Sequence, residues 1–125
     1  MSFRFQDSRV FIVFADVPDP RVEAQAAALL ALGAGLADRN MIVFAVIGDD
    51  MVVPIYGKAP PGSAAGALRA QYRAQTGSSF TAVLIGKDGT VKWREDRPAD
   101  PAELFGLIDT MPMRRQEQAQ RKPTR

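Results

Sequence analysis

The stretch Arg9-Val-Phe-Ile-Val-Phe-Ala15 is a continuous apolar run, rich in β-branched and aromatic residues, behind a single charge. Such a run is typical of a strand buried on both faces, as in a parallel sheet covered by helices. Asp19 and Pro20 then favour the start of a helix, because aspartate can cap a helix and proline suits its first position. Apolar residues recur at helical spacing as far as Leu36, and a second buried-strand run follows at 41–47. A strand, a helix of about twenty residues and a strand predict a right-handed βαβ unit.

The middle of the chain is rich in glycine and proline. Residues 48–62 are therefore expected to be irregular, exposed and mobile. Ser63 can cap a second helix, which is predicted to run to about Gln75 and to end at Gly77.

The last third of the chain predicts a hairpin and one more helix. The runs 80–86 and 90–94 are predicted strands, and Lys87-Asp88-Gly89 between them is a strong turn signal. Asp100-Pro101 repeats the capped helix start, and Pro112 is expected to end this helix.

The resulting order, β-α-β-α-β-β-α, is that of the thioredoxin fold. It predicts an α/β domain with a central four-stranded mixed sheet and helices on both faces. We expect residues 1–112 to form this domain and residues 113–125 to form a basic, polar C-terminal tail that is frayed or forms a loosely docked helical turn.

The composition limits the chemistry, because the 125 residues include neither cysteine nor histidine. Thiol oxidoreductase and thiol-peroxidase activities are excluded, since both need a thiolate. Acid–base catalysis would fall to Asp, Glu, Lys or Tyr. No apolar run approaches the roughly 20 residues of a membrane span, and no secretory signal is present. We therefore expect a cytoplasmic protein that has no contact with membranes and no cofactor, and an enzymatic role is disfavoured but left open.

Three segments carry a resemblance to a known family: Arg9–Ala15, Gly86–Gly89 with Lys92, and above all Ile108–Glu117. Over roughly residues 8–118 the chain resembles the domain of unknown function 4174. The resemblance implies a thioredoxin- or peroxiredoxin-like fold and supplies no reaction. Related domains occur in bacterial proteins, often exported, and in animal extracellular-matrix proteins with sushi or coiled-coil regions.

Four aspartates follow the first two predicted strands, at the end where a redox thioredoxin carries its cysteines. Neighbouring strands would bring them to one edge of the sheet, where oxygen ligands could bind Mg²⁺ or Ca²⁺. The alternative is a helix cap and solvated loop acids, which is the more common role of such residues. The four candidates are Asp16, Asp19, Asp49 and Asp50.

A second group of charges is expected at the opposite end of the sheet. There the first strand begins, the first helix ends, the hairpin turns and the last helix ends. The group is interpreted either as an ion-pair network that holds the C-terminal motif, which is favoured, or as a recognition surface for a partner or a small anion. Its members are Arg9, Arg39, Lys87, Asp88, Asp109 and Arg114.

The C-terminal residues 111–125 carry five basic groups and one acid. No aromatic residue lies among them to stack on bases, so a solvated terminus is favoured over nucleic-acid contact. The leading hypothesis is a non-enzymatic module that binds another protein or a second copy of itself. The alternative is a non-thiol enzyme or cation-binding protein that uses the four aspartates.

Overall fold

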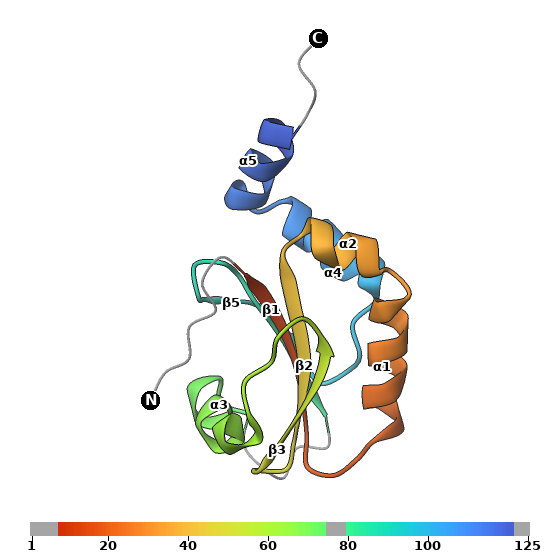
Figure 1. Cartoon of the computed structure of the whole chain (residues 1–125), viewed down its shortest axis with the longest axis vertical. Helices are drawn as coiled ribbons and strands as arrows, with labels where there is room; N and C mark the ends of the chain where they lie inside the picture. Colours follow the sequence, from red (N-terminus) through yellow and green to blue (C-terminus); the bar gives the residue numbers. More distant parts are fainter. Residues whose placement is uncertain (1–7, 75–79, 122–125) are drawn as a thin grey trace.

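Strand β1 (Arg9–Ala15) lies at the centre of a five-stranded sheet with the order β3-β2-β1-β4-β5. The structure is a computed structural model that describes residues 8–74 and 80–121. All seven residues of β1 are buried, as the apolar run predicts. β1 pairs in parallel with β2 (Met41–Ile47) and antiparallel with β4 (Thr81–Ile85), and β4 pairs antiparallel with β5 (Val91–Glu95). The predicted mixed α/β fold is therefore confirmed (Figure 1).

Helices cover both faces of the sheet. Helices α1 (Pro20–Leu30), α2 (Gly33–Asp38) and α4 (Pro101–Asp109) pack on one face, against side chains of β1 such as Phe11 and Val13. The short helix η1 (Gly62–Ala64) and α3 (Ala65–Gln71) pack on the other face, against Val10, Ile12 and Phe14. Successive side chains of β1 therefore point into two separate hydrophobic cores, one on each face of the sheet.

The two helix starts predicted from an Asp-Pro pair are confirmed. The carboxylate of Asp19 accepts a hydrogen bond from the Arg21 amide at 2.8 Å, and α1 begins with Pro20. The carboxylate of Asp100 accepts one from the Ala102 amide at 3.0 Å, ahead of α4. In each case a side chain satisfies a backbone donor that the helix itself cannot satisfy.

The strand count is corrected from four to five, because part of the segment predicted to be irregular forms β3 (Met51–Tyr56). β3 pairs antiparallel with β2, and the register shifts between Val43 and Phe44. β3 contains Pro54, which lacks a backbone donor, and it lies at the edge of the described sheet, where proline is tolerated.

The first two predicted helices are also corrected. The expected helix of about twenty residues is divided into α1 and α2, since Leu32 leaves helical geometry (φ −115°, ψ 38°) just before Gly33. The second helix begins as a 3-10 turn at Gly62, and the Ser63 side chain does not cap α3. This helix ends by Tyr72, and Arg73 has a left-handed φ of 55°. The predicted end at Gly77 lies outside the described residues.

The hairpin between β4 and β5 has the predicted turn, but only one of its residues has a positive φ. The Gly86 amide donates to the Thr90 carbonyl and the Gly89 amide to the Gly86 carbonyl, both at 3.0 Å, and Gly89 has a φ of 83°. Asp88 contributes through its carboxylate, which accepts hydrogen bonds from the amide and hydroxyl of Thr90. This is a three-residue turn with glycine at the left-handed position.

Helix α5 (Pro112–Arg121) follows α4 and extends beyond the end of the sheet (Figure 1). It begins at the proline that was expected to stop the preceding helix. The division into a domain of residues 1–112 and a tail of 113–125 stays a prediction, and residues 122–125 lie outside the described part. Among the described residues, no helix is both long enough and apolar enough to cross a membrane.

Candidate functional site

One end of the molecule, which we call the α5 pole, collects charged side chains from four separate segments. They are the start of β1, the end of α2, the β4–β5 turn and the α4–α5 junction, and Figure 1 shows these segments together below α5. Two arginines are almost fully buried here: Arg9 is 0% exposed and Arg114 is 1% exposed. Buried guanidinium groups need acceptors, so their partners define the site.

Arg114 attaches α5 to the rest of the domain. Its Nε donates to Asp109 Oδ1 at 3.0 Å, its Nη1 donates to the Asp38 carbonyl at 2.9 Å, and its Nη2 bonds the Asp38 carboxylate. The other oxygen of Asp109 accepts a hydrogen bond from Arg39 Nη2 at 2.9 Å. The Arg39 guanidinium also lies 4.2 Å from the centroid of the Phe105 ring. The predicted residues Arg39, Asp109 and Arg114 are therefore in direct contact.

Arg9 and Lys87 meet at a different carboxylate, that of Glu117 on α5. The two Nη atoms of Arg9 donate to the two oxygens of Glu117, each at 3.2 Å, and Lys87 Nζ lies 2.6 Å from Oε2. Arg9 Nη1 also donates to the Arg39 carbonyl at 2.9 Å. Arg9 Nε is buried and has no hydrogen-bond partner among the described residues. Glu117 thus bridges the start of β1 and the hairpin.

Asp88, the remaining predicted residue, lies on the exposed hairpin turn. Its carboxylate lies 2.9 Å from Lys92 Nζ and accepts hydrogen bonds from the amide and the hydroxyl of Thr90, so its described partners all lie on the hairpin. The hydrogen bonds from Lys92 and Thr90 lower the pKa of Asp88 to about 2. Asp88 is therefore ionised at any physiological pH.

The carboxylates of Asp109 and Glu117 are held in their charged form. Burial alone would raise the pKa of Asp109, but the hydrogen bonds from Arg39 and Arg114 hold it below its usual value. Glu117 shows the same balance, with burial opposed by Arg9 and Lys87, and its pKa is also lowered. The network contains four cations and three carboxylates and so carries an excess positive charge; its members are Arg9, Arg39, Lys87, Arg114, Asp38, Asp109 and Glu117.

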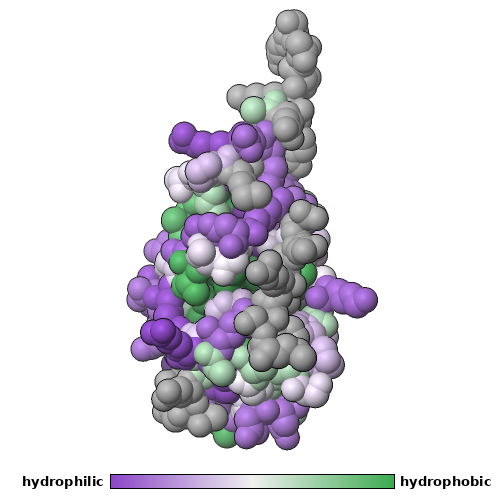
Figure 2. Space-filling model, turned by 90° about the vertical axis from the view of Figure 1, so that its left-hand side faces the viewer, coloured by the Kyte–Doolittle hydropathy of each residue, from purple (hydrophilic) through white to green (hydrophobic). Residues whose placement is uncertain are grey.

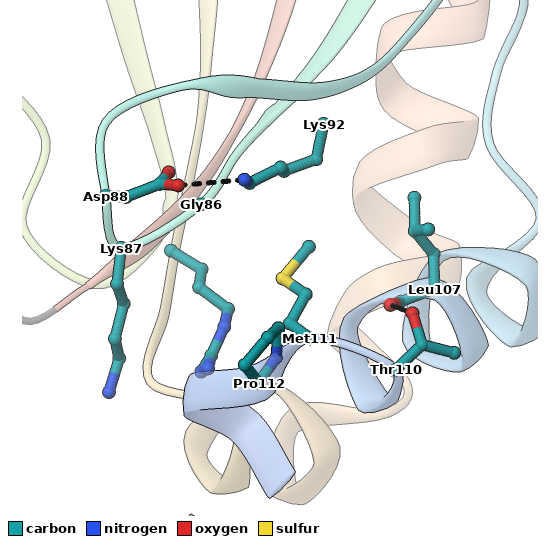
Figure 3. A pocket seen from close by; sticks show the side chains of 9 residues that line it. Gly86, Lys87, Asp88, Lys92, Leu107, Thr110, Met111 and Pro112 are labelled. Carbon is teal, nitrogen blue, oxygen red and sulfur yellow. Dashed lines mark hydrogen bonds and ion pairs between the residues drawn. The ribbon is translucent and has the colours of Figure 1, made fainter. Parts of the chain in front are cut away.

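A pocket of about 270 Å³ opens beside this network. Figure 3 shows the hairpin residues on one side of it and the α4–α5 junction on the other. Hydrophobic and hydrophilic patches alternate on the face seen in Figure 2. The pocket has an apolar wall, which includes Leu107 and Met111, and charged edges on the hairpin. It is lined by Arg9, Gly86, Lys87, Asp88, Lys92, Leu107, Thr110, Met111 and Pro112.

At the opposite pole, the ends of β1 and β2, the four predicted aspartates do not form a common group. Asp19 is occupied by Arg21, whose Nη2 lies 2.7 Å from Oδ2 and whose side-chain hydrogen bonds lower the pKa of Asp19. Asp16 Oδ1 lies 3.8 Å from Arg69 Nη2, while Asp49 and Asp50 are exposed in the turn before β3. Within residues 8–74 and 80–121, no set of three or more acidic, histidine or cysteine side chains is placed to hold a metal ion.

Three functional or structural residues were missed by the reading of the sequence. Glu117 had a signal, because it is the only acid in residues 111–125 and ends the segment that carries the family resemblance. Asp38 gave only a weak signal, because it precedes Arg39 near the expected end of the first helix. Arg69 gave no signal, because its acceptors are backbone carbonyls, those of Gly48, Ala15 and Ala74.

Comparison with known proteins agrees with the resemblance in the sequence. Residues 4–117 match a family that is described as a domain of unknown function, DUF4174. No curated protein matches the chain. The matched range includes the segments that form the α5 pole: the start of β1, the end of α2, the β4–β5 turn, and α4 and α5 as far as Glu117. The chain belongs to the DUF4174 family.

Proposed function

We propose that this domain is a non-enzymatic protein-binding module, and that its partner places an apolar side chain in the pocket at the α5 pole. The observation that carries the proposal is the pocket itself, which has a volume of about 270 Å³. In it, Leu107, Met111 and Pro112 lie opposite the charged hairpin. An apolar cavity with a few charged groups at its edge is the usual form of a recognition site. A volume of this size accommodates one or two side chains of a partner.

The chemistry of the pocket supports binding more than catalysis. General acid–base catalysis works best when a group has a pKa near the operating pH. The carboxylate in the lining is Asp88, and its pKa of about 2 makes it a weak base. The lysines Lys87 and Lys92 are each engaged by a carboxylate at 2.6 Å and 2.9 Å. With no cysteine in the chain, a thiol nucleophile is excluded as well.

The test is affinity capture with a variant that fills the pocket. Thr110 is exposed, lines the pocket and lies at the end of α4, so Thr110→Phe places an aromatic ring at the pocket mouth. Ala102→Phe puts the same ring on the exposed first turn of the same helix, away from the lining residues, and is the matched control. Capture uses the cytoplasmic fraction, where the sequence predicts that the protein resides.

The proposal expects a protein that is retained by wild type and Ala102→Phe and is lost with Thr110→Phe. That protein is then purified and titrated into the isotope-labelled domain, and amide shifts are expected at the hairpin and at the α4–α5 junction. Sedimentation of the domain alone shows whether the partner is a second copy. Equal retention by all three forms, or shifts confined to another surface, would remove the pocket from the function.

A further inference from the structure

Glu117 occupies a carboxylate-binding site that belongs to the rest of the domain. Arg9 lies at the start of the central strand and Lys87 in the hairpin turn, so both cations are fixed by the sheet. Together they donate three charge-assisted hydrogen bonds to the two oxygens of Glu117. A bidentate arginine supported by a lysine is a specific arrangement for recognising a carboxylate.

Glu117 does not use this site fully. The two bonds from Arg9 are 3.2 Å long, whereas charge-assisted bonds of this type are typically about 2.7–2.9 Å. Arg9 Nε, although buried, has no acceptor among the described residues, and Arg9 lines the pocket. A buried donor without an acceptor is unfavourable. The site therefore has an unused donor on a residue that lines the pocket.

The helix that carries Glu117 is held mainly by charge. Among the α5 residues whose side chains are described, the buried one is Arg114, which hydrogen-bonds Asp109 and Asp38 and whose Nη1 also lies 3.9 Å from Glu117 Oε1. The hydrogen bonds to Asp38 and Asp109 do not involve Glu117, so they keep the start of α5 attached when Glu117 leaves its site. The network also carries one more cation than it has carboxylates, which favours an anionic visitor.

From these contacts we propose that the partner is an acidic protein segment, in which a carboxylate replaces that of Glu117 between Arg9 and Lys87 while a neighbouring apolar side chain enters the pocket. This inference rests on the proposed function, because it names the partner of the same pocket. Glu117 is then an internal competitor, and the affinity for the partner is reduced by the fraction of molecules in which Glu117 occupies the site.

The experiment compares two variants of the full chain. Glu117→Gln removes the competing charge and keeps the shape of the side chain. Glu103→Gln is the matched control, since Glu103 is an exposed acid on α4 that pairs with Arg97 at 3.2 Å and does not line the pocket. The probe is the capped peptide acetyl-Gly-Leu-Glu-Gly-amide, and the same peptide with glutamine is its neutral counterpart. Dissociation constants are measured by amide shifts in NMR titrations.

The proposal expects Glu117→Gln to bind the glutamate peptide about tenfold more tightly than wild type or Glu103→Gln. The glutamine peptide should show no such gain, and Lys87→Gln should weaken binding of the glutamate peptide. Lys87→Gln also keeps the test decisive if Glu117→Gln does not fold.

Equal affinity of wild type and Glu117→Gln for the glutamate peptide would overturn the exchange. If shifts at Leu107 and Met111 persisted in that case, the proposed function would stand without it. Absence of shifts at the pocket with every peptide would count against the proposed function itself. A single-stranded DNA oligomer that bound Glu117→Gln more tightly than the peptide would overturn the assignment of a protein partner.

Discussion

Each pole of the molecule contains buried arginine, but the acceptors differ. At the α5 pole, Arg9 and Arg114 bond the carboxylates of Glu117, Asp38 and Asp109. At the opposite pole, Arg69 donates to the carbonyls of Ala15 and Ala74 at 2.7 and 2.8 Å and to that of Gly48. A backbone carbonyl in a strand or turn is fixed in position and does not titrate. A side-chain carboxylate can move away and can be protonated.

The two poles therefore differ in whether the acceptors of their arginines are fixed in the backbone or lie on side chains that another acceptor can replace. Arg69 joins the ends of β1 and β2 to the end of α3, and it lies 5.7 Å from the centroid of the Phe14 ring, within one rigid core. Arg9 joins β1 to a residue 108 positions further along the chain, on a helix outside the sheet. We therefore expect substitutions at the Arg69 pole to affect stability alone, and those at the α5 pole to affect both stability and recognition.

The largest effect is expected for Arg69→Met. The substitution removes the donor to the carbonyls of Gly48 and Ala74, while the Ala15 carbonyl keeps the hydrogen bond from the Gly48 amide; a buried acceptor without a partner costs about 1–3 kcal/mol. The free energy of unfolding should fall by about 3 kcal/mol or more, by the same amount at pH 7 and pH 5. Urea unfolding measures it. The control is Arg94→Met, which also removes a donor to two carbonyls, those of Tyr72 and Arg73, but at an exposed position, so its cost should stay below about 1 kcal/mol. Similar costs for the two variants would remove the structural role of the Arg69 pole.

A smaller loss is expected for Asp109→Ala. It removes the carboxylate that Arg39 and Arg114 share, at a cost of about 1–3 kcal/mol. Asp109→Asn should cost less, because the amide oxygen still accepts a hydrogen bond. Thermal melting measures both, and Glu95→Ala, which breaks an exposed pair with Arg97, is expected to stay within about 0.5 kcal/mol. A melting curve of Asp109→Ala that superimposes on that of wild type would contradict the anchoring role of Asp109.

The third prediction concerns pH. The pKa values of Asp109 and Glu117 are lowered in the folded state, from ordinary values of 3.8 and 4.5. A lowered pKa contributes stability above the ordinary value, and this contribution is lost as the pH falls through the folded-state pKa. Glu117→Gln should therefore be less stable than wild type by about 1 kcal/mol at pH 7, and the difference should shrink below about pH 4. Urea unfolding across this range tests it. Gln116→Ala, a neutral exposed change on α5, should give a difference that does not vary with pH.

The smallest effect is expected for divalent cations at the opposite pole. Asp19 is held by Arg21, and Asp16 faces Arg69, so the pole offers a cation few available oxygens. Millimolar Ca²⁺ or Mg²⁺ should leave the melting temperature unchanged, whereas a cation at 100 times its dissociation constant would add about 2.7 kcal/mol, or several degrees. A shift of that size, abolished by Asp16→Asn with Asp49→Asn, would establish a metal site here.

Much of the fold could be predicted because its strongest signals are local. The strands β1, β2 and β4 are buried on both faces and therefore read as continuous apolar runs. Asp19 and Asp100 indicate where their helices begin, because each caps a backbone amide only two residues further along the chain. β3 was missed because its short apolar run contains Pro54 and lies in a segment rich in glycine and proline, a composition that favours irregular structure.

For the candidate site, the sequence predicts which residues lie at the α5 pole better than it predicts which of them form ion pairs with one another. The topology brings the end of α2, the turn and the end of α4 to one pole, which is why Arg39 and Asp109 could be placed together. The partner of Arg9 and Lys87 is Glu117, which lies on α5. The α5 sequence is mostly polar, so its apolar residues do not indicate how long the helix is or how it packs. The pocket could not be predicted, because it forms between side chains of segments that meet only in the folded chain.

The two edges of the described sheet have a consequence for how this domain meets other chains. β3 carries Pro54 and pairs with β2 through an irregular register, and β5 exposes charged side chains, those of Lys92, Arg94 and Glu95. Prolines, irregularities and charges at the edge are the devices by which natural sheets resist edge-to-edge aggregation. Both edges are therefore unfavourable for edge-to-edge backbone pairing with a strand of another chain.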